Sequence, residues 1–148
     1  MSWIIVPYVS AGVIKLGMNQ AEVEKLIGAP KNTRSGTLYE KIEFRSADAP
    51  VVYYDTLGVA EIVFSRFAKE VKFLNLDVFA NDGKAVLKEL SSKYDDFILN
   101  DDVIISKKSG VSLTGFHDGE LSQKAFGLFK DGVWNPDNLK NAKPVKFP

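Results

Sequence analysis

The chain has 148 residues, of which 45% are apolar and 26% charged, a composition typical of a single globular domain. Nineteen basic and nineteen acidic residues cancel, which argues against a general nucleic-acid-binding protein, because phosphate contacts normally need a basic excess. The sequence contains no cysteine, which excludes disulfides, thiolate metal sites and a cysteine nucleophile.

The first residues do not resemble a targeting segment. They lack a basic region, and Pro7 interrupts a short apolar run. A secretory signal normally needs about 7–15 apolar residues, and a membrane helix about 18. We therefore expect a cytoplasmic protein that does not contact membranes.

The first predicted helix begins after Asn19 and ends at Gly28. Asn19 is a suitable N-cap, and Glu22, three residues later, completes a capping box. Glycine at the C-terminal end supplies the left-handed conformation that commonly stops a helix. One apolar stripe follows from the helical spacing of three residues: Val23, Leu26 and Ile27.

Three antiparallel strands are predicted after this helix. Residues 38–45 alternate apolar Leu38, Ile42 and Phe44 with polar or charged side chains, which indicates a half-buried strand with a polar face. Residues 51–54 are rich in β-branched and aromatic residues, and a turn at 55–58 leads into a strand over 59–67.

The second half has a similar order of elements. A strand over 71–76 precedes a helix capped by Asn81 or Asp82 and ending near Tyr94. Strand-like segments then follow at 97–99, 103–106, 111–114 and 125–129.

This order predicts an α+β fold of two tandem helix-plus-antiparallel-meander repeats, which form one compact domain or two small packed sheets. The predicted domains are residues 1–70 and 71–133, followed by an irregular, proline-punctuated tail over 134–148. A single sheet covered by two helices would produce the same order of elements.

The residues that usually carry catalysis are sparse. His117 is the one histidine, and no Gly-x-Ser-x-Gly elbow is present to build a Ser-His-Asp triad with it. A zinc site needs more histidine or cysteine, and the glycines are too widely spaced for a dinucleotide fingerprint. We therefore predict no enzymatic activity, no cofactor and no metal. The alternative that stays open is a carboxylate-only magnesium or calcium site, with a metal-dependent activity that would involve Asp101 or Asp102.

Acidic residues form one dense cluster in the sequence. It consists of Asp95, Asp96, Asp101 and Asp102, which bracket a short predicted strand. These residues are either solvated turn residues or an acidic patch that meets a basic partner.

Four further residues are candidates for protein contacts. Tyr39 and Arg45 share the predicted polar face of one strand, Tyr53 lies in the next, and Trp134 begins the tail. Tyrosine, tryptophan and arginine are enriched at binding hot spots, although large aromatic side chains also pack beneath tails.

Residues 12–30, GVIKLGMNQAEVEKLIGAP, resemble the opening of small helix–sheet modules of the SmpA/OmlA (BamE) type. In tandem, such modules are similar to proteins of the beta-lactamase inhibitory protein type and to bacterial toxin-immunity proteins. The resemblance implies a non-enzymatic protein-binding module, a cytoplasmic immunity protein that occludes a toxin domain. The acidic cluster, where it contributes to binding, would favour a basic partner such as a nuclease domain. It also leaves open an envelope-associated assembly module of the BamE type without its anchor. A homodimer formed through an open strand edge is a further possibility.

Overall fold

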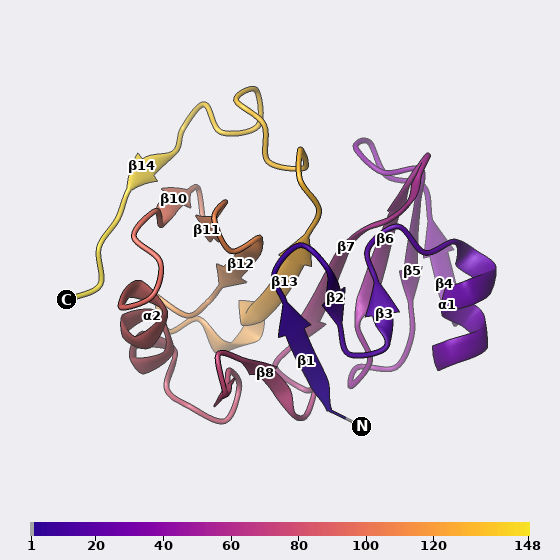
Figure 1. Ribbon diagram of the computed structural model, residues 1–148, viewed down its shortest axis with the longest axis horizontal. Helices are drawn as coiled ribbons and strands as arrows, with labels where there is room; N and C mark the ends of the chain where they lie inside the picture. The colour runs from indigo at the N-terminus through magenta and orange to yellow at the C-terminus, as the bar shows by residue number, and fades with distance from the viewer. Residues whose placement is uncertain (1) are drawn as a thin grey trace.

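The structure is a computed structural model that describes residues 2–148 (Figure 1). Its elements, in chain order, are β1 (Trp3–Val6), β2 (Ser10–Ala11), β3 (Ile14–Lys15), α1 (Gln20–Ile27), β4 (Asn32–Arg34), β5 (Lys41–Phe44), β6 (Val51–Asp55), β7 (Gly58–Ser65), β8 (Val71–Phe73), β9 (Leu76–Asp77), α2 (Gly83–Ser91), β10 (Ile98–Asn100), β11 (Val103–Ser106), β12 (Val111–Thr114), η1 (Leu121–Gln123), β13 (Ala125–Phe129) and β14 (Lys143–Pro144). Among these described residues, no helix combines the length and the apolar character needed to cross a bilayer.

Nine strands form one antiparallel sheet in the order β14-β10-β11-β12-β13-β7-β6-β5-β4. The pairing of β13 with β7 joins the two halves of the chain, with a register that runs from Ala125 opposite Ser65 to Phe129 opposite Glu61. Figure 1 shows these two strands side by side near the centre of the molecule.

The other five strands form a smaller sheet in the order β3-β2-β1-β8-β9. Its central pair, β1 and β8, is parallel, with Trp3 opposite Val71. The remaining pairs in this sheet are antiparallel. Both sheets therefore take strands from both halves of the sequence.

The predicted fold of two tandem helix-plus-meander repeats is wrong. Strands make up 35% of the chain and helices 14%, and the strands form two large sheets instead of two repeats. The alternative prediction, a single sheet covered by two helices, is also wrong, because the structure contains a second sheet of five strands. Apolar alternation predicts where strands occur, but it does not specify their partners, because the backbone hydrogen bonds that join strands are the same for every sequence.

The two predicted helices are confirmed, with one change of boundary. In α1, Asn19 Oδ1 accepts from the Glu22 backbone N–H at 2.8 Å and the Asn19 N–H donates to Glu22 Oε1 at 3.0 Å, which is the expected capping box. Asp82 is the N-cap of α2, and its carboxylate accepts from the Ala85 N–H at 3.2 Å. This helix ends at Ser91, three residues before the predicted end.

The hydrophobic core lies between the two sheets and also includes the apolar faces of both helices. Trp3 packs against Phe64 with ring centroids 5.2 Å apart, and Phe73 packs against Phe126 at 5.9 Å. We call the face of the nine-stranded sheet that contributes to this core, with Val52 as an example, the inner face. The opposite face is the outer face.

The tail crosses from the centre of the large sheet to its far edge (Figure 1). It leaves β13 after Phe129 and returns as β14, which pairs with β10. On the way, the Asn138 carbonyl accepts from Asn100 Nδ2 at 3.4 Å. The segment predicted as irregular therefore closes one edge of the sheet.

Candidate functional site

Three side chains meet on the outer face of the large sheet, and we call Tyr39, Tyr53 and Glu61 the outer-face cluster. The rings of Tyr39 and Tyr53 have centroids 4.9 Å apart, and the Tyr39 hydroxyl donates to Glu61 Oε1 at 2.5 Å. Tyr53 lies opposite Glu61, next to an irregularity in the β6–β7 register that leaves Ala60 without a partner. Such bulges re-aim side chains and are frequent beside functional sites.

Glu61 is buried, with 9% of its surface exposed. The neighbouring strand offers it space, because Gly127 has no side chain. A β-carbon at Gly127 would lie 2.6 Å from Ser112 Oγ and 3.5 Å from Glu61 Oε2. The carboxylate therefore rests beside the bare backbone of β13.

The electrostatic environment of Glu61 is unusual for a carboxylate. Burial raises its pKa, and the hydrogen bond from Tyr39 only partly opposes this shift. Among residues 2–148, no lysine, arginine or histidine forms an ion pair with it. Burial also raises the pKa of Tyr39 and Tyr53, with the Glu61 charge adding to the shift in both. A carboxylate whose pKa is raised by burial beside a cleft is a candidate binding or catalytic residue.

A pocket of about 340 Å³ adjoins the outer-face cluster, and the Tyr39 side chain is part of its lining. The pocket lies between the residues before β5, the β6–β7 hairpin and the first part of the tail. Lys130 pairs with Asp55 there, while Asp131 makes no ion pair within the described chain. The full lining is Leu38, Tyr39, Asp55, Ala60, Lys130, Asp131, Gly132, Val133, Asn135 and Asn138. Two carboxylates against one lysine give this pocket a net negative charge.

Of the residues predicted to bind a partner, the structure brings Tyr39 and Tyr53 together and separates Arg45 from them. Arg45 is on the inner side, where its Nε and Nη2 donate to the Gly28 carbonyl at 3.0 and 2.9 Å. Its Nη2 also lies 3.2 Å from Glu43 Oε1, and only 4% of the side chain is exposed. Two residues of the expected polar face, Glu43 and Arg45, therefore have buried side chains, and Arg45 is a structural residue.

Trp134 lies in the tail, between two residues that line the pocket, Val133 and Asn135. Its indole Nε1 is buried and has no hydrogen-bond partner within the described chain. Trp134 therefore belongs to the segment that forms one wall of the pocket, although Trp134 itself is not among the lining residues.

The four clustered aspartates do not form one patch. Asp95 and Asp96 precede β10, and Asp101 and Asp102 follow it, so the two pairs are separated by the length of the strand, about 10–15 Å. Asp95 forms an exposed ion pair with Lys108 at 2.6 Å. Asp96 accepts hydrogen bonds from Ser106 Oγ at 2.7 Å and from the Lys108 N–H at 2.8 Å. These two hydrogen bonds stabilise the turn between β11 and β12.

Within residues 2–148, His117 forms no side-chain hydrogen bond with a serine and has Asp118 as its neighbouring acid. Its Nε2 lies 4.0 Å from Asp118 Oδ2, and its Nδ1 is buried without a hydrogen-bond partner in the part of the chain that the structure describes. Over residues 2–148, no three histidine, aspartate or glutamate side chains gather closely enough to hold a metal ion.

Glu61 was not among the residues predicted from the sequence to form a site. The residue interrupts an apolar run, Val59 to Phe64, that reads as an ordinary strand. A single acid inside such a run is the signal that could have identified it, because an ionised side chain is rarely buried without a partner.

Comparison with known proteins gives no family assignment. No protein-family model, no curated protein and no solved structure matches the chain. The function is therefore inferred from the outer-face cluster and its pocket.

Proposed function

We propose that this chain is a non-enzymatic protein-binding module, and that it acts in the cytoplasm as an immunity protein that occludes a toxin domain with a basic surface. The observation that carries this proposal is the buried carboxylate of Glu61, which has a tyrosine hydroxyl as its hydrogen-bond donor and no cationic partner in residues 2–148.

A buried charge without a counter-ion is costly, and a cationic side chain brought close to it offsets this cost. A lysine or arginine of a partner would complement Glu61 and the acidic pocket beside it. The two tyrosine rings add large, rigid contact surfaces of the kind that anchor protein interfaces, and they can also receive a cation over their faces.

The toxin-immunity part of the proposal rests on the resemblance of residues 12–30 to small helix–sheet modules. Residues 2–148 do not fold as tandem repeats, so the architecture adds no support to it. The charge of the site does support a basic partner, because complementary charge accelerates association and favours partners of opposite sign.

The proposal is tested with a tagged chain used to capture partners from lysate of its own cells, in the wild type and in two variants of the outer-face cluster. We expect a stoichiometric protein whose affinity falls at least ~30-fold in Glu61→Gln, the cost typical of removing one member of a buried charge pair. Tyr53→Ala should also weaken capture. Glu89→Gln, which changes an exposed glutamate on α2, is the matched control and should bind normally.

A growth assay then addresses neutralisation. The captured protein, expressed alone, should arrest growth, and co-expression of the wild-type chain should restore growth while Glu61→Gln restores it poorly. Absence of any stoichiometric partner, or capture that is equal in wild type and in both cluster variants, would reject the proposal.

A further inference from the structure

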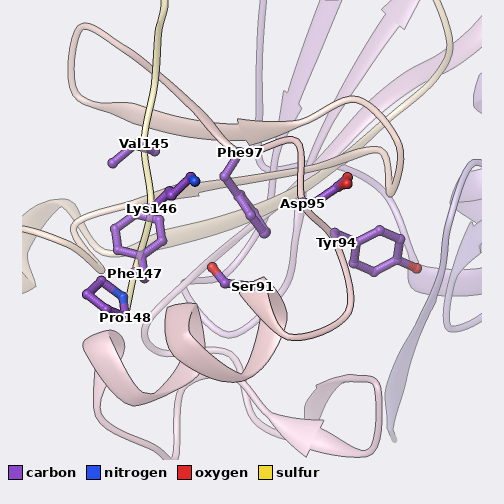
Figure 2. A pocket seen from close by; sticks show the side chains of 8 residues that line it. All are labelled: Ser91, Tyr94, Asp95, Phe97, Val145, Lys146, Phe147 and Pro148. Atoms are coloured by element: carbon purple, nitrogen blue, oxygen red, sulfur yellow. The ribbon is translucent and has the colours of Figure 1, made fainter.

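A second pocket, of about 420 Å³, lies between the end of α2 and the last residues of the chain (Figure 2). Its lining consists of Ser91, Tyr94, Asp95, Phe97, Val145, Lys146, Phe147 and Pro148. The volume is within the range of small-molecule sites, which are mostly apolar with a few polar groups. It shares no residue with the outer-face cluster or with the acidic pocket.

The pocket contains one polar group that the protein leaves unsatisfied. Ser91 Oγ is buried and has no hydrogen-bond partner within residues 2–148. Figure 2 shows this hydroxyl turned toward the space between Phe97 and Phe147. The next residue, Ser92, behaves differently, because its Oγ donates to the Glu89 carbonyl at 2.6 Å. A buried hydroxyl without a partner is unfavourable, so a ligand that offers it a hydrogen bond gains affinity.

Two of the aromatic side chains that line the pocket contact each other. Phe97 and Phe147 meet edge to face, with centroids 6.3 Å apart and an interplanar angle of 77°. Edge-to-face and offset contacts are the geometries that aromatic rings prefer, and both side chains also line the pocket, so a ligand ring there can make the same kind of contact with them.

The tail forms one wall of the pocket and is held by backbone hydrogen bonds and by the packing of Val145 and Phe147 against the core. The Val145 N–H donates to the Phe97 carbonyl at 3.1 Å, and β14 pairs with β10 at two positions, through Lys143 and Pro144. A ligand between the tail and α2 would add contacts to both, and would thereby hold the tail against the body of the protein.

We propose that this pocket binds a small aromatic molecule that carries a hydroxyl group, of the phenol or benzyl alcohol class. The ring packs against the pair formed by Phe97 and Phe147, and the hydroxyl exchanges a hydrogen bond with Ser91 Oγ. This inference is independent of the proposed function, because it concerns a different surface and a different class of ligand.

The test compares 4-methylphenol with toluene, which differ by the hydroxyl, in titrations followed by NMR chemical shifts. We expect 4-methylphenol to bind the wild type with a dissociation constant of about 1 mM, a normal value for a ligand with so few atoms. It should bind about five-fold more tightly than toluene, the effect of one additional hydrogen bond. Exchange of the Val145 amide should slow when the ligand is bound.

Three variants sharpen the test. Ser91→Ala should abolish the preference for 4-methylphenol over toluene, Ser92→Ala should retain it, and Ser91→Leu should fill the pocket and abolish binding of both ligands. The proposal is overturned if 4-methylphenol does not bind the wild type at ~10 mM, a concentration that detects even fragment-strength affinity. It is also overturned if Ser91→Ala keeps the preference or Ser91→Leu binds as the wild type does.

Discussion

Two glutamates are buried in the same sheet, on opposite faces and with opposite surroundings. Glu43, on the inner side, accepts from the Tyr54 hydroxyl at 2.7 Å and has Arg45 Nη2 at 3.2 Å and Lys41 Nζ at 3.7 Å. Glu61, on the outer face, accepts from one tyrosine and has no cation near it within the described residues.

This difference distinguishes a structural acid from a candidate binding residue. Burial alone does not separate the two, because both side chains are largely covered. The number of compensating partners separates the two glutamates, because a buried carboxylate with a structural role is surrounded by hydrogen-bond donors and cations. Glu61 lacks such cations within the described residues, which is why the proposed function assigns it a cationic partner.

We expect the largest change in stability from removing a cation that compensates the buried charge of Glu43. Arg45→Met leaves Glu43 buried without its closest cation, and we expect a loss of about 3 kcal/mol in the free energy of unfolding. Urea denaturation at pH 7 measures it. The control is Arg66→Met, whose guanidinium lies over the exposed Phe67 ring and should change stability little. A loss below about 1 kcal/mol in the Arg45 variant would mean that this ion pair is not structural.

A change in stability of the opposite sign is expected at Glu61, which has no cationic partner within the described residues. Glu61→Gln removes a buried charge that has no cation, so the variant should be more stable than the wild type at pH 8, by about 1.5 kcal/mol. Because the folded pKa of Glu61 is raised, the wild type binds this proton more tightly when folded than when unfolded.

It follows that the wild type loses stability relative to Glu61→Gln as the pH rises from the unfolded pKa, about 4.3, through the higher folded pKa. Urea titrations between pH 4 and pH 8 measure this difference, and the comparison with the variant cancels the contributions of other carboxylates. A difference that stays constant over this range would show that Glu61 has an ordinary pKa.

A smaller effect is expected from the hydrogen bond that Glu61 does have. Tyr39→Phe should lower the free energy of unfolding by about 1 kcal/mol and raise the pKa of Glu61 further, because this bond lowers the pKa in the wild type. NMR titration of the Glu61 carboxyl carbon reports the pKa. Tyr53→Phe is the matched control, since no hydrogen bond to Glu61 is lost. An equal pKa shift in both variants would contradict the assigned role of Tyr39.

The smallest effect is expected at the exposed ion pair. Lys108→Ala removes the partner of Asp95, and both side chains are mostly in solvent, so the urea midpoint should not change measurably. Asp96→Ala, which removes two hydrogen bonds from the adjacent turn, should lower the midpoint clearly. A comparable loss in both variants would show that the exposed pair stabilises the fold after all.

Local structure was largely predictable from the sequence, whereas the side of the sheet on which residues lie was not. The capping box of Asn19 and Glu22 and the strands at 51–54, 103–106 and 111–114 depend on contacts within a few residues, and all are present. In the strand predicted over 38–45, the apolar residues were expected to be buried and the polar residues exposed. In the structure, the buried residue of β5 is Glu43. Glu43 and Arg45 are buried because α1 and β6 bring a carbonyl and a hydroxyl to them, and those partners are distant in the sequence.

The sequence by itself determined that this chain has two short capped helices, many short strands and no cysteine chemistry, since those properties follow from residue identity and local spacing. Only the tertiary structure decided that β8 pairs with β1 and β13 with β7, and that Tyr39, Tyr53 and Glu61 meet on one face. The physical reason is that strand pairing uses backbone groups common to all residues, so long-range packing selects the partners, and the chemistry of the site follows from that selection.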